Sequence, residues 1–181
     1  MDEGALRIAG LPVREMMIPL EDYPTVCAKD TVREAIARMQ AAALDVAGQR
    51  SLPRVLLVLA DGNHLVGIVR RRDILRALIP EFLRRAPLRH HKNPFQISVD
   101  HNLAELSLES IVSAIHRHAE YPVSKVMRPL PASVEENDHL LKAISEMVNE
   151  DLAILPVMRG NQVVGVVRSV DVFRELTQLL P

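Results

Sequence analysis

The sequence predicts an α/β protein built from two copies of one unit, in which a helix, a β-hairpin and a second helix follow one another. Three observations support this prediction. Segments of the first half return in the second half in the same order, and each copy alternates strand-like apolar runs with helix-like apolar stripes. Of the 181 residues, 48% are apolar and 25% are charged, which is typical of a globular protein. A chain of this length buries roughly 70% of its unfolded surface and needs neither a metal nor a disulfide to fold.

The repeat is recognised by residue type and by spacing. Residues 62–76, GNHLVGIVRRRDILR, return as residues 160–174, GNQVVGVVRSVDVFR, at an offset of 98. Residues 13–20, VREMMIPL, return as residues 123–130, VSKVMRPL, at an offset of 110. The offset falls because the first copy carries two extra residues in an early loop and ten more ahead of its hairpin.

Each copy follows one order of elements. A first helix carries an apolar stripe, a continuous apolar run forms a strand buried on both faces, a tight turn leads into a return strand, and a second helix begins at an aspartate. In the first copy these are a helix capped by Thr31 and Glu34, strands 55–59 and 65–69 around a turn at Asp61-Gly62, and a helix from Asp73. In the second copy they are a helix capped by Asp138, strands 154–158 and 163–167 around a turn at Gly160-Asn161, and a helix from Asp171.

The segment between the copies is basic and is interrupted by prolines. Residues 70–92 contain eight Arg or Lys and two acids, within a chain whose net charge is −1. Apolar residues at helical spacing over 103–119 then predict an extra helix. We therefore expect one repeat over 11–79, a basic connector with the extra helix over 80–121, and a second repeat over 122–180.

Composition argues against several classes of protein. A net charge near zero and an aromatic content of 3% argue against nucleic-acid binding, so a solvated surface is favoured for the basic connector over a docking surface. A single cysteine excludes a disulfide framework and a Cys-rich zinc site. The start of the sequence does not resemble a signal peptide, and its apolar runs are too short to cross a bilayer. We therefore expect a cytoplasmic protein with no membrane association.

Motifs for catalysis and for metal binding fail on inspection. The glycine spacing of Gly62 and Gly67 matches a phosphate-binding loop, but Ile68 follows where that motif needs lysine. His116 and His118 lie two apart, which on a helix points them away from each other, and Cys27 has no partner that would activate it. The sequence thus predicts no catalytic residue, no metal site and no enzyme activity.

At this point the residues match a known family. A Met-Pro entry, a capped helix, a hairpin and then Gly-Ile-Val-x-x-x-Asp before a helix resemble the cystathionine-β-synthase (CBS) domain, and the tandem pair resembles a Bateman module. The resemblance implies two β-α-β-β-α repeats that pack through their hairpin sheets about a pseudo-twofold axis. It also implies clefts between the repeats that bind an adenine-containing ligand such as AMP, ADP, ATP or S-adenosylmethionine.

The resemblance also assigns candidate site residues. Asp73 and Asp171 occupy the positions at which family members hold a ribose, although capping of a helix start explains an aspartate there equally well. An apolar slot for the base would come from the first strand and the hairpin of each repeat. Any single residue there is more often simply part of the hydrophobic core. The slot residues are Thr25, Val26, Cys27, Ser133, Val134, Leu56, Ile154 and Pro156.

The sequence departs from the family three residues after the motif glycine. Many ligand-binding members carry Ser or Thr there, whereas this chain has Arg70 and Arg168. Each arginine could clamp a phosphate with a forked pair of hydrogen bonds, which would suit a polyphosphate ligand. Each could instead fill the slot or pair with its aspartate, Asp73 or Asp171, and leave a degenerate module that only dimerises.

The function expected from these residues is a regulatory module that senses adenine nucleotides and acts on an unidentified downstream protein. The alternatives are a ligand-free CBS pair that serves in dimerisation or interaction and, less favoured, a nucleic-acid-associated regulator that uses the basic connector. A homodimer is expected because the second helix of each repeat carries more apolar surface than one such body buries. These residues are Ile74, Leu75, Leu78, Ile79 and Phe82 in one helix and Val172, Phe173, Leu176 and Leu179 in the other.

Overall fold

The computed structural model consists of two copies of one β-α-β-β-α unit, as predicted. The structure describes residues 10–42, 44–46, 49–51, 53–80 and 108–177. The first repeat comprises β2 (Thr25–Cys27), α2 (Val32–Ala41), β5 (Val55–Ala60), β6 (His64–Arg70) and α3 (Arg71–Leu78). The second comprises β7 (Val134–Glu135), α7 (Leu140–Asn149), β8 (Ile154–Arg159), β9 (Gln162–Arg168) and α8 (Ser169–Thr177).

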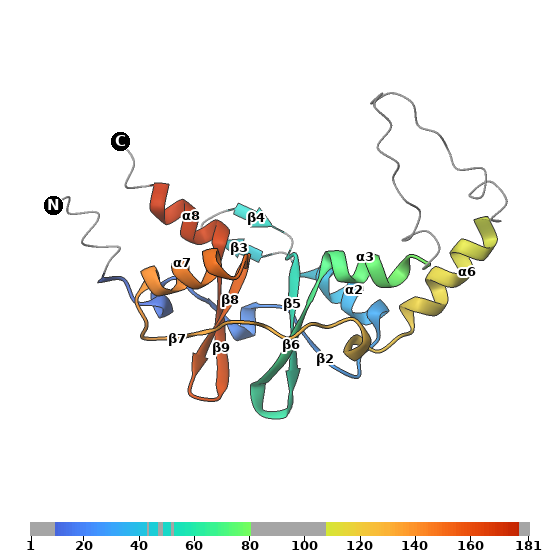
Figure 1. Cartoon of the computed structure of the whole chain (residues 1–181), viewed down its shortest axis with the longest axis horizontal. Helices are drawn as coiled ribbons and strands as arrows, with labels where there is room; N and C mark the ends of the chain where they lie inside the picture. Colours follow the sequence, from blue (N-terminus) through green and yellow to red (C-terminus); the bar gives the residue numbers. More distant parts are fainter. Residues whose placement is uncertain (1–9, 43, 47–48, 52, 81–107, 178–181) are drawn as a thin grey trace, which may run out of the picture.

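Each repeat builds a small sheet around its hairpin. The first strand runs parallel to the outgoing hairpin strand, β2 beside β5 and β7 beside β8, and the hairpin strands pair antiparallel. The two hairpins lie side by side with their turns at the same end of the molecule, and the helices gather toward the other end (Figure 1). One apolar cluster joins the two sheets, because Leu57 and Ile68 of the first repeat pack with Ile154 and Val166 of the second. The predicted packing through hairpin sheets is confirmed.

The segment that leads into each repeat docks on the other repeat. The backbone N–H of Val13, in η1 (Val13–Glu15), donates to the carbonyl of Asp138 at 2.9 Å. Reciprocally, the N–H of Val123, in η4 (Val123–Lys125), donates to the carbonyl of Asp30 at 2.7 Å. The side chains of Val13 and Val123 are fully buried in the core of the opposite repeat. The two repeats are therefore interlocked, and the exchange has the reciprocity of a twofold contact.

Further along, each leading segment crosses the return strand of the other hairpin. β1 (Ile18–Pro19) pairs antiparallel with β9, and Arg128 pairs in the same way with Ile68 of β6. Both crossings pass over a motif glycine. A β-carbon built on Gly67 would lie 2.7 Å from the carbonyl oxygen of Arg128, and one built on Gly165 would lie 2.6 Å from that of Ile18. Glycine is required because only a residue without a side chain lets the two backbones come this close.

A short hairpin and a helix have no counterpart in the other repeat of the described chain. The extra residues of the first copy form a two-stranded hairpin of β3 (Leu44–Val46) and β4 (Gln49–Ser51), which the sequence did not predict. The predicted extra helix is present as α6 (Leu108–Ala119), which packs on α3 and α2. The Nδ1 atom of His118 on α6 lies 3.2 Å from the carbonyl oxygen of Leu78. Most of the basic connector, and Phe82 and Leu179 of the predicted dimer surface, lie outside the described residues.

Local predictions for the helix starts had different outcomes. Thr31 and Glu34 form the predicted capping box of α2. Asp138 was expected to cap α7 and does not, because α7 starts after His139 and the Asp138 carboxylate instead accepts from the N–H of Glu135 at 2.9 Å. Cys27, a residue of the predicted base slot, is exposed at the end of β2. No helix in the described part of the chain is long and apolar enough to span a membrane.

Candidate functional site

A cleft opens between the two repeats where their second helices begin. Its volume is about 500 Å³, within the range of small-ligand pockets. Residues from both repeats face it, and they are Tyr23, Pro53, Arg54, Val55, Arg71, Ala153, Ile154, Arg168, Ser169 and Val170. Arg71 and Ser169 are the first residues of α3 and α8, so the positive ends of both helix dipoles border the same cavity.

The cleft combines an apolar wall with cationic groups. Tyr23 is buried and packs with Val55 and Ile154, and its hydroxyl donates to the carbonyl of Val55 at 2.8 Å. Burial raises the pKa of the Tyr23 hydroxyl well above its ordinary value, so the ring stays neutral. Arg54 and Arg71 supply guanidinium groups, Arg168 supplies a third whose charge is paired with Asp171, and the described lining contains no carboxylate. The cleft is therefore suited to an anion that carries an apolar group.

Arg168 also belongs to a buried ion pair with one of the predicted ribose residues. Its Nε donates to Asp171 Oδ2 at 2.6 Å and its second terminal nitrogen to Asp171 Oδ1 at 2.8 Å. The two residues are 7% and 6% exposed, so the pair is shielded from water. Arg174 lies 3.7 Å from Oδ1, too far for a hydrogen bond. Both oxygens of Asp171 thus already accept from Arg168.

The equivalent pair in the first repeat has a third member. Arg70 donates to both oxygens of Asp73, at 2.6 and 3.0 Å, and Arg128 donates to Asp73 Oδ1 at 3.0 Å. Arg128 comes from the leading segment of the second repeat, so this cluster crosses between repeats. Burial raises the pKa of the Asp73 carboxyl, but the hydrogen bonds and charges of Arg70, with those of Arg128, outweigh it and hold the pKa below its ordinary value.

The direction of this shift predicts a pH-dependent contribution to stability. Because the folded pKa of Asp73 is lower than the unfolded value of about 3.9, the contribution is complete at neutral pH and is lost as pH falls below about 4. Urea unfolding between about pH 6 and pH 3 should show a smaller fall in the free energy of unfolding for Asp73→Asn than for the wild type. Asp151→Asn, at an exposed carboxylate, should keep the wild-type dependence, and an unchanged dependence in Asp73→Asn would contradict the assignment.

The predicted base-slot residues do not come together in one place. Val26 and Leu56 lie in the core of the first repeat and Val134 in that of the second, each at most 2% exposed. Pro156 is buried within β8, and Cys27 is exposed at the end of β2. Ile154 faces the cleft between the repeats, whereas Thr25 and Ser133 line two other clefts.

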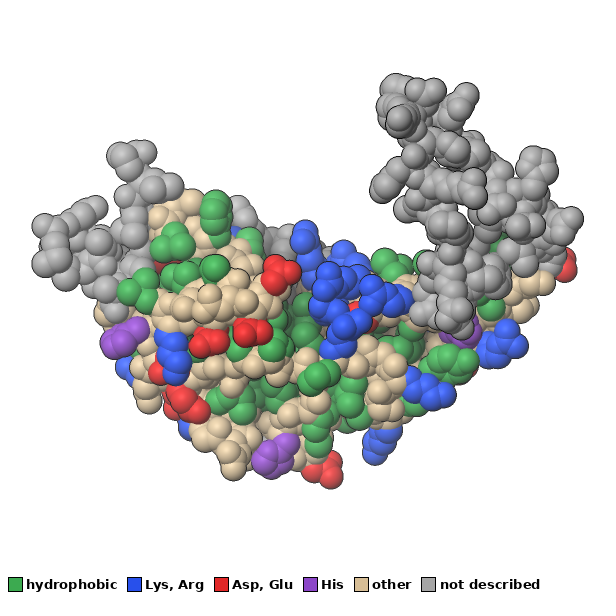
Figure 2. Space-filling model, viewed as in Figure 1, with side chains coloured by type: hydrophobic (Ala, Val, Ile, Leu, Met, Phe, Trp, Pro, Cys, Tyr) green, Lys and Arg blue, Asp and Glu red, His purple; other side chains and the backbone are tan. Residues whose placement is uncertain are grey.

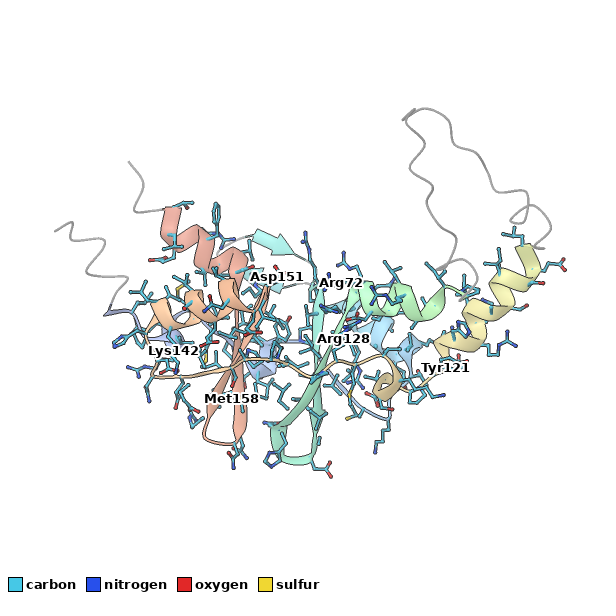
Figure 3. The ribbon with its side chains drawn as sticks, viewed as in Figure 1. Arg72, Tyr121, Arg128, Lys142, Asp151 and Met158 are labelled. Atoms are coloured by element: carbon cyan, nitrogen blue, oxygen red, sulfur yellow. The ribbon has the colours of Figure 1, made fainter. Side chains whose placement is uncertain are left out.

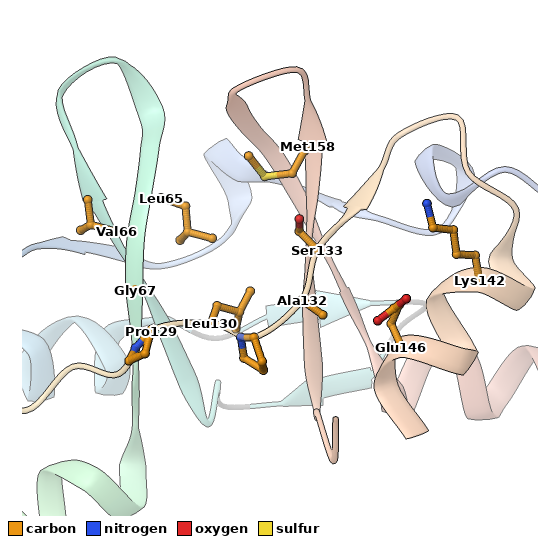
Figure 4. Close-up of a pocket in the computed structure, with 11 residues that line it drawn as sticks. Leu65, Val66, Gly67, Pro129, Leu130, Ala132, Ser133, Lys142, Glu146 and Met158 are labelled. Carbon is orange, nitrogen blue, oxygen red and sulfur yellow. The ribbon is translucent and has the colours of Figure 1, made fainter. Parts of the chain in front are cut away.

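Those two clefts lie near the hairpins and are related by the repeat. One holds Ser133 and has a volume of about 670 Å³; its lining includes Leu65 of β6 and Met158 of β8, with Lys142 and Glu146 on the side of α7 (Figure 4). Lys142 donates to Asp138 at 2.7 Å, so its charge is already paired. Thr25 lines the other, which measures about 650 Å³. Neither collects the set of cations that marks the cleft between the repeats.

The family is decided by a comparison with protein-family models. The model of the CBS domain matches two regions of the sequence, residues 13–80 and 123–178, which are the two repeats described above. The chain belongs to the CBS-domain family. It is a CBS pair, as its sequence motifs had indicated, and no curated protein matches it closely enough to say more.

Solved CBS pairs share the fold. The CBS domain of a CBS domain-containing membrane protein from Sphaerobacter thermophilus matches with a TM-score of 0.64 at 19% identity, over 94% of this chain and 91% of that one. A CBS domain-containing protein from Bacillus anthracis str. Ames Ancestor matches with a TM-score of 0.65 at 16% identity, over 96% and 98%. CBSX2, whose structure is a complex with AMP, matches with a TM-score of 0.61 at 20% identity, over 95% and 100%.

Sequence reasoning missed several residues of this CBS pair's cleft. Arg54, Arg71 and Tyr23 face the cleft, and Arg128 reaches Asp73, yet none of them is a residue that the two copies share. The run Arg70-Arg71-Arg72 was the available signal, although it was assigned to a solvated connector. Lys and Arg side chains gather over the start of α3 in Figure 2. Figure 3, drawn in the same view, labels Arg72 and Arg128 in this region. Within the described residues, no group of three or more His, Cys, Asp or Glu side chains could hold a metal ion.

Proposed function

We propose that this CBS pair is a cytoplasmic, non-catalytic regulatory module that binds an adenine nucleotide in the cleft between its repeats. The observation that carries the proposal is the cleft itself, where an apolar wall at Tyr23, Val55 and Ile154 meets the guanidinium groups of Arg54, Arg71 and Arg168. A purine base would lie on the apolar wall and the phosphates beside the arginines. The complex of CBSX2 with AMP supports a ligand of this class for this fold.

The interlocked architecture supports a regulatory role for such a ligand. Residues of both repeats line the cleft, so a nucleotide would contact both and favour one arrangement of the pair over another. A ligand shifts such an equilibrium only by the difference between its affinities for the two arrangements. The downstream protein would sense this arrangement at the exposed surface of the helices.

Thermal unfolding in the presence of AMP, ADP, ATP, S-adenosylmethionine or NAD tests the proposal. A bound ligand at about 100 times its dissociation constant should stabilise the fold by roughly 2.7 kcal/mol and raise the midpoint accordingly. Guanine nucleotides at the same ionic strength are the control for selectivity, and they should shift the midpoint less. Failure of every adenine-containing ligand to shift it would reject the sensor and favour the assembly role below.

A second candidate function, assembly without a ligand, is favoured by one specific observation. Both predicted ribose carboxylates, Asp73 and Asp171, are already engaged by arginines. The occupant we propose for the exposed helix surface is a second copy of the chain. Leu75 of α3 and Ile79, which directly follows α3, are exposed in the stretch that carries the exposed Arg72 and Arg76. Val148 of α7 and Phe173 of α8 are exposed in the repeat that presents Glu150 and Asp151.

Charge complementarity sets the orientation of this dimer. Contact between two copies of α3 would bring arginines together, whereas α3 against the α7–α8 pair of a second copy brings arginines to carboxylates and buries apolar side chains. We therefore expect a head-to-tail homodimer. Phe173→Glu, at a side chain that is 68% exposed, should weaken dimerisation at least tenfold in sedimentation equilibrium, with Gln40→Glu on α2 as the control. A Phe173→Glu protein that dimerises as tightly as the wild type would contradict this surface.

A further inference from the structure

The exposed face of α3 combines arginines with apolar side chains. Arg71, Arg72 and Arg76 are exposed on this helix, and Leu75 is 54% exposed. Residues three and four positions apart are neighbours on a helix surface, so Leu75 lies beside Arg71 and Arg72, and Arg76 lies one turn beyond Arg72. Ile79, which directly follows the helix, continues the apolar stripe and is also exposed.

Two neighbouring segments add arginines to this surface. The backbone N–H of Arg71 donates to the carbonyl of Arg54 at 2.9 Å, which places Arg54 beside the first turn of α3. Arg128 reaches the same turn through its hydrogen bond to Asp73. The resulting cluster of Lys and Arg side chains is seen over the start of α3 in Figure 2. We use the name arginine face for Leu75, Ile79 and six arginines, which are Arg54, Arg70, Arg71, Arg72, Arg76 and Arg128.

Most of the positive charge on the arginine face is not balanced. Asp73 is the one described carboxylate among these residues, and it is buried and shared by two of the arginines. Arg54, Arg72 and Arg76 form no ion pair with a carboxylate of the described chain, and Arg71 donates to a backbone carbonyl instead. Such a local excess of one sign of charge attracts a polyanion, although the whole chain has a net charge of −1.

We propose that the arginine face is the docking surface for the downstream protein, and that the segment bound there is an acidic amphipathic helix. Its carboxylates would accept forked hydrogen bonds from the arginines, while its apolar side chains would cover Leu75 and Ile79. This apolar stripe favours a protein over a nucleic acid, whose phosphate backbone has no apolar side chains to place on it. The inference rests on the proposed regulatory role and names the chemistry of the partner.

The arginine face and the cleft between the repeats share two residues. Arg54 and Arg71 belong to the face and also line the cleft. A phosphate chain in the cleft would balance their charge, so the face would attract an acidic helix less strongly. Because coupling between two binding sites is reciprocal, the bound helix would lower the affinity for the nucleotide by the same factor. The nucleotide and the downstream protein would therefore oppose each other.

Fluorescence anisotropy of a labelled synthetic peptide, titrated with the full-length protein, tests the inference. The probe is a peptide of Glu and Leu, with Leu at helical spacing and about 15 residues long, the length at which isolated helices begin to form. It should bind, and its affinity should fall as NaCl is added, because salt screens exposed charges. The same peptide with Lys in place of Glu should not bind. Failure of the Glu peptide to bind at low salt would overturn the proposal.

Two variants separate the charge of the face from its apolar stripe, and neither changed residue lines the cleft. Arg72→Glu should weaken binding of the Glu peptide about tenfold, because it replaces an attraction by a repulsion. Leu75→Ser should weaken it about fivefold and leave its salt dependence unchanged. Arg117→Glu, at an exposed arginine of α6, is the matched control and should change the affinity less than about twofold. Equal losses in Arg72→Glu and Arg117→Glu would show that only the net charge of the chain matters, and would overturn the face.

Two other occupants of the face are distinguished by further titrations. A labelled DNA duplex at the same ionic strength should bind about tenfold more weakly than the Glu peptide. A duplex that binds more tightly, and equally well to Leu75→Ser, would assign the face to nucleic acid and overturn the proposal. The peptide should bind Phe173→Glu and the wild type equally. Binding to Phe173→Glu alone would show that a second copy of the chain covers the face.

The last titration distinguishes failure of the regulation from failure of the proposed function. Saturating ADP should weaken the Glu peptide about threefold or more, within the usual range of coupling between sites. If ADP raises the unfolding midpoint but leaves the peptide affinity unchanged, the opposition through Arg54 and Arg71 is wrong. If the peptide binds as expected and no adenine nucleotide shifts the midpoint, the proposed function fails and the docking surface stands.

Discussion

Replacement of Arg168 by alanine should lower the free energy of unfolding by about 3–5 kcal/mol, the largest loss that we expect from one substitution at the cleft. The reason is the carboxylate that remains. Asp171 is 6% exposed, and without Arg168 it keeps only Arg174 at 3.7 Å. Denaturant unfolding at neutral pH measures the loss, which is a large fraction of the stability of an ordinary domain.

Two further variants show whether the loss comes from the unpaired charge. Arg70→Ala should be milder, because Arg70 is partly exposed and Asp73 retains Arg128. The double variant Arg168→Met with Asp171→Leu removes both charges and keeps the volume, so it should recover most of the stability lost in Arg168→Ala. Equal losses in the free energy of unfolding for Arg168→Ala and Arg70→Ala would contradict the argument that the more deeply buried pair contributes more.

Alanine at either motif glycine should destabilise the fold by about 1–3 kcal/mol, because the backbones that cross there must separate. The new β-carbon would stand 2.6 Å from the Ile18 carbonyl oxygen in Gly165→Ala and 2.7 Å from that of Arg128 in Gly67→Ala. Neither contact is relieved by a side-chain rotation, since the obstacle is backbone. Thermal and denaturant unfolding both measure the effect, and it outweighs the gain of about 0.4–1 kcal/mol that loss of glycine brings through the unfolded state.

Gly10→Ala is the control for this pair, because a β-carbon there meets no atom within 4 Å. Its stability should equal or slightly exceed that of the wild type. The two motif variants should also lose affinity for any ligand of the cleft, since the crossings hold the leading segments that interlock the repeats. A Gly165→Ala protein as stable as the Gly10→Ala protein would show that the crossing tolerates a wider spacing.

The elements of the repeat were predictable because each depends on local chemistry. The capping box of Thr31 and Glu34 and the apolar run of β5 are short-range signals, and both are present as expected. The failure at Asp138 has a local reason as well. Its carboxylate is engaged by the N–H of Glu135, and the position equivalent to Thr31 is His139, so α7 begins without a side-chain cap.

The site was harder to predict, because its residues meet only after the repeats interlock. The base slot was assigned by sequence position within each repeat, yet Val26, Leu56 and Val134 point into the cores of the repeats. Arg54 and Arg71 are not shared by the two copies, so the sequence analysis assigned them no ligand role. Only the contact between the repeats brings them to the same cleft as Arg168. The sequence left open whether Arg70 and Arg168 pair with an aspartate or with a ligand. In this structure each of them pairs with its aspartate.

Taken alone, the order of residues determined the duplication and the type of each repeated element, because these follow from periodicity and spacing along one stretch of chain. Its motifs also resembled the CBS family to which the chain belongs. Only the tertiary structure decided which repeat each leading segment packs on and which cations surround one cavity. It also showed that Gly67 and Gly165 are needed because another backbone crosses each of them. The physical reason is that hydrogen bonding and burial between distant segments depend on how the two sheets face each other. A charged side chain chooses its partner only once that packing has removed water from around it.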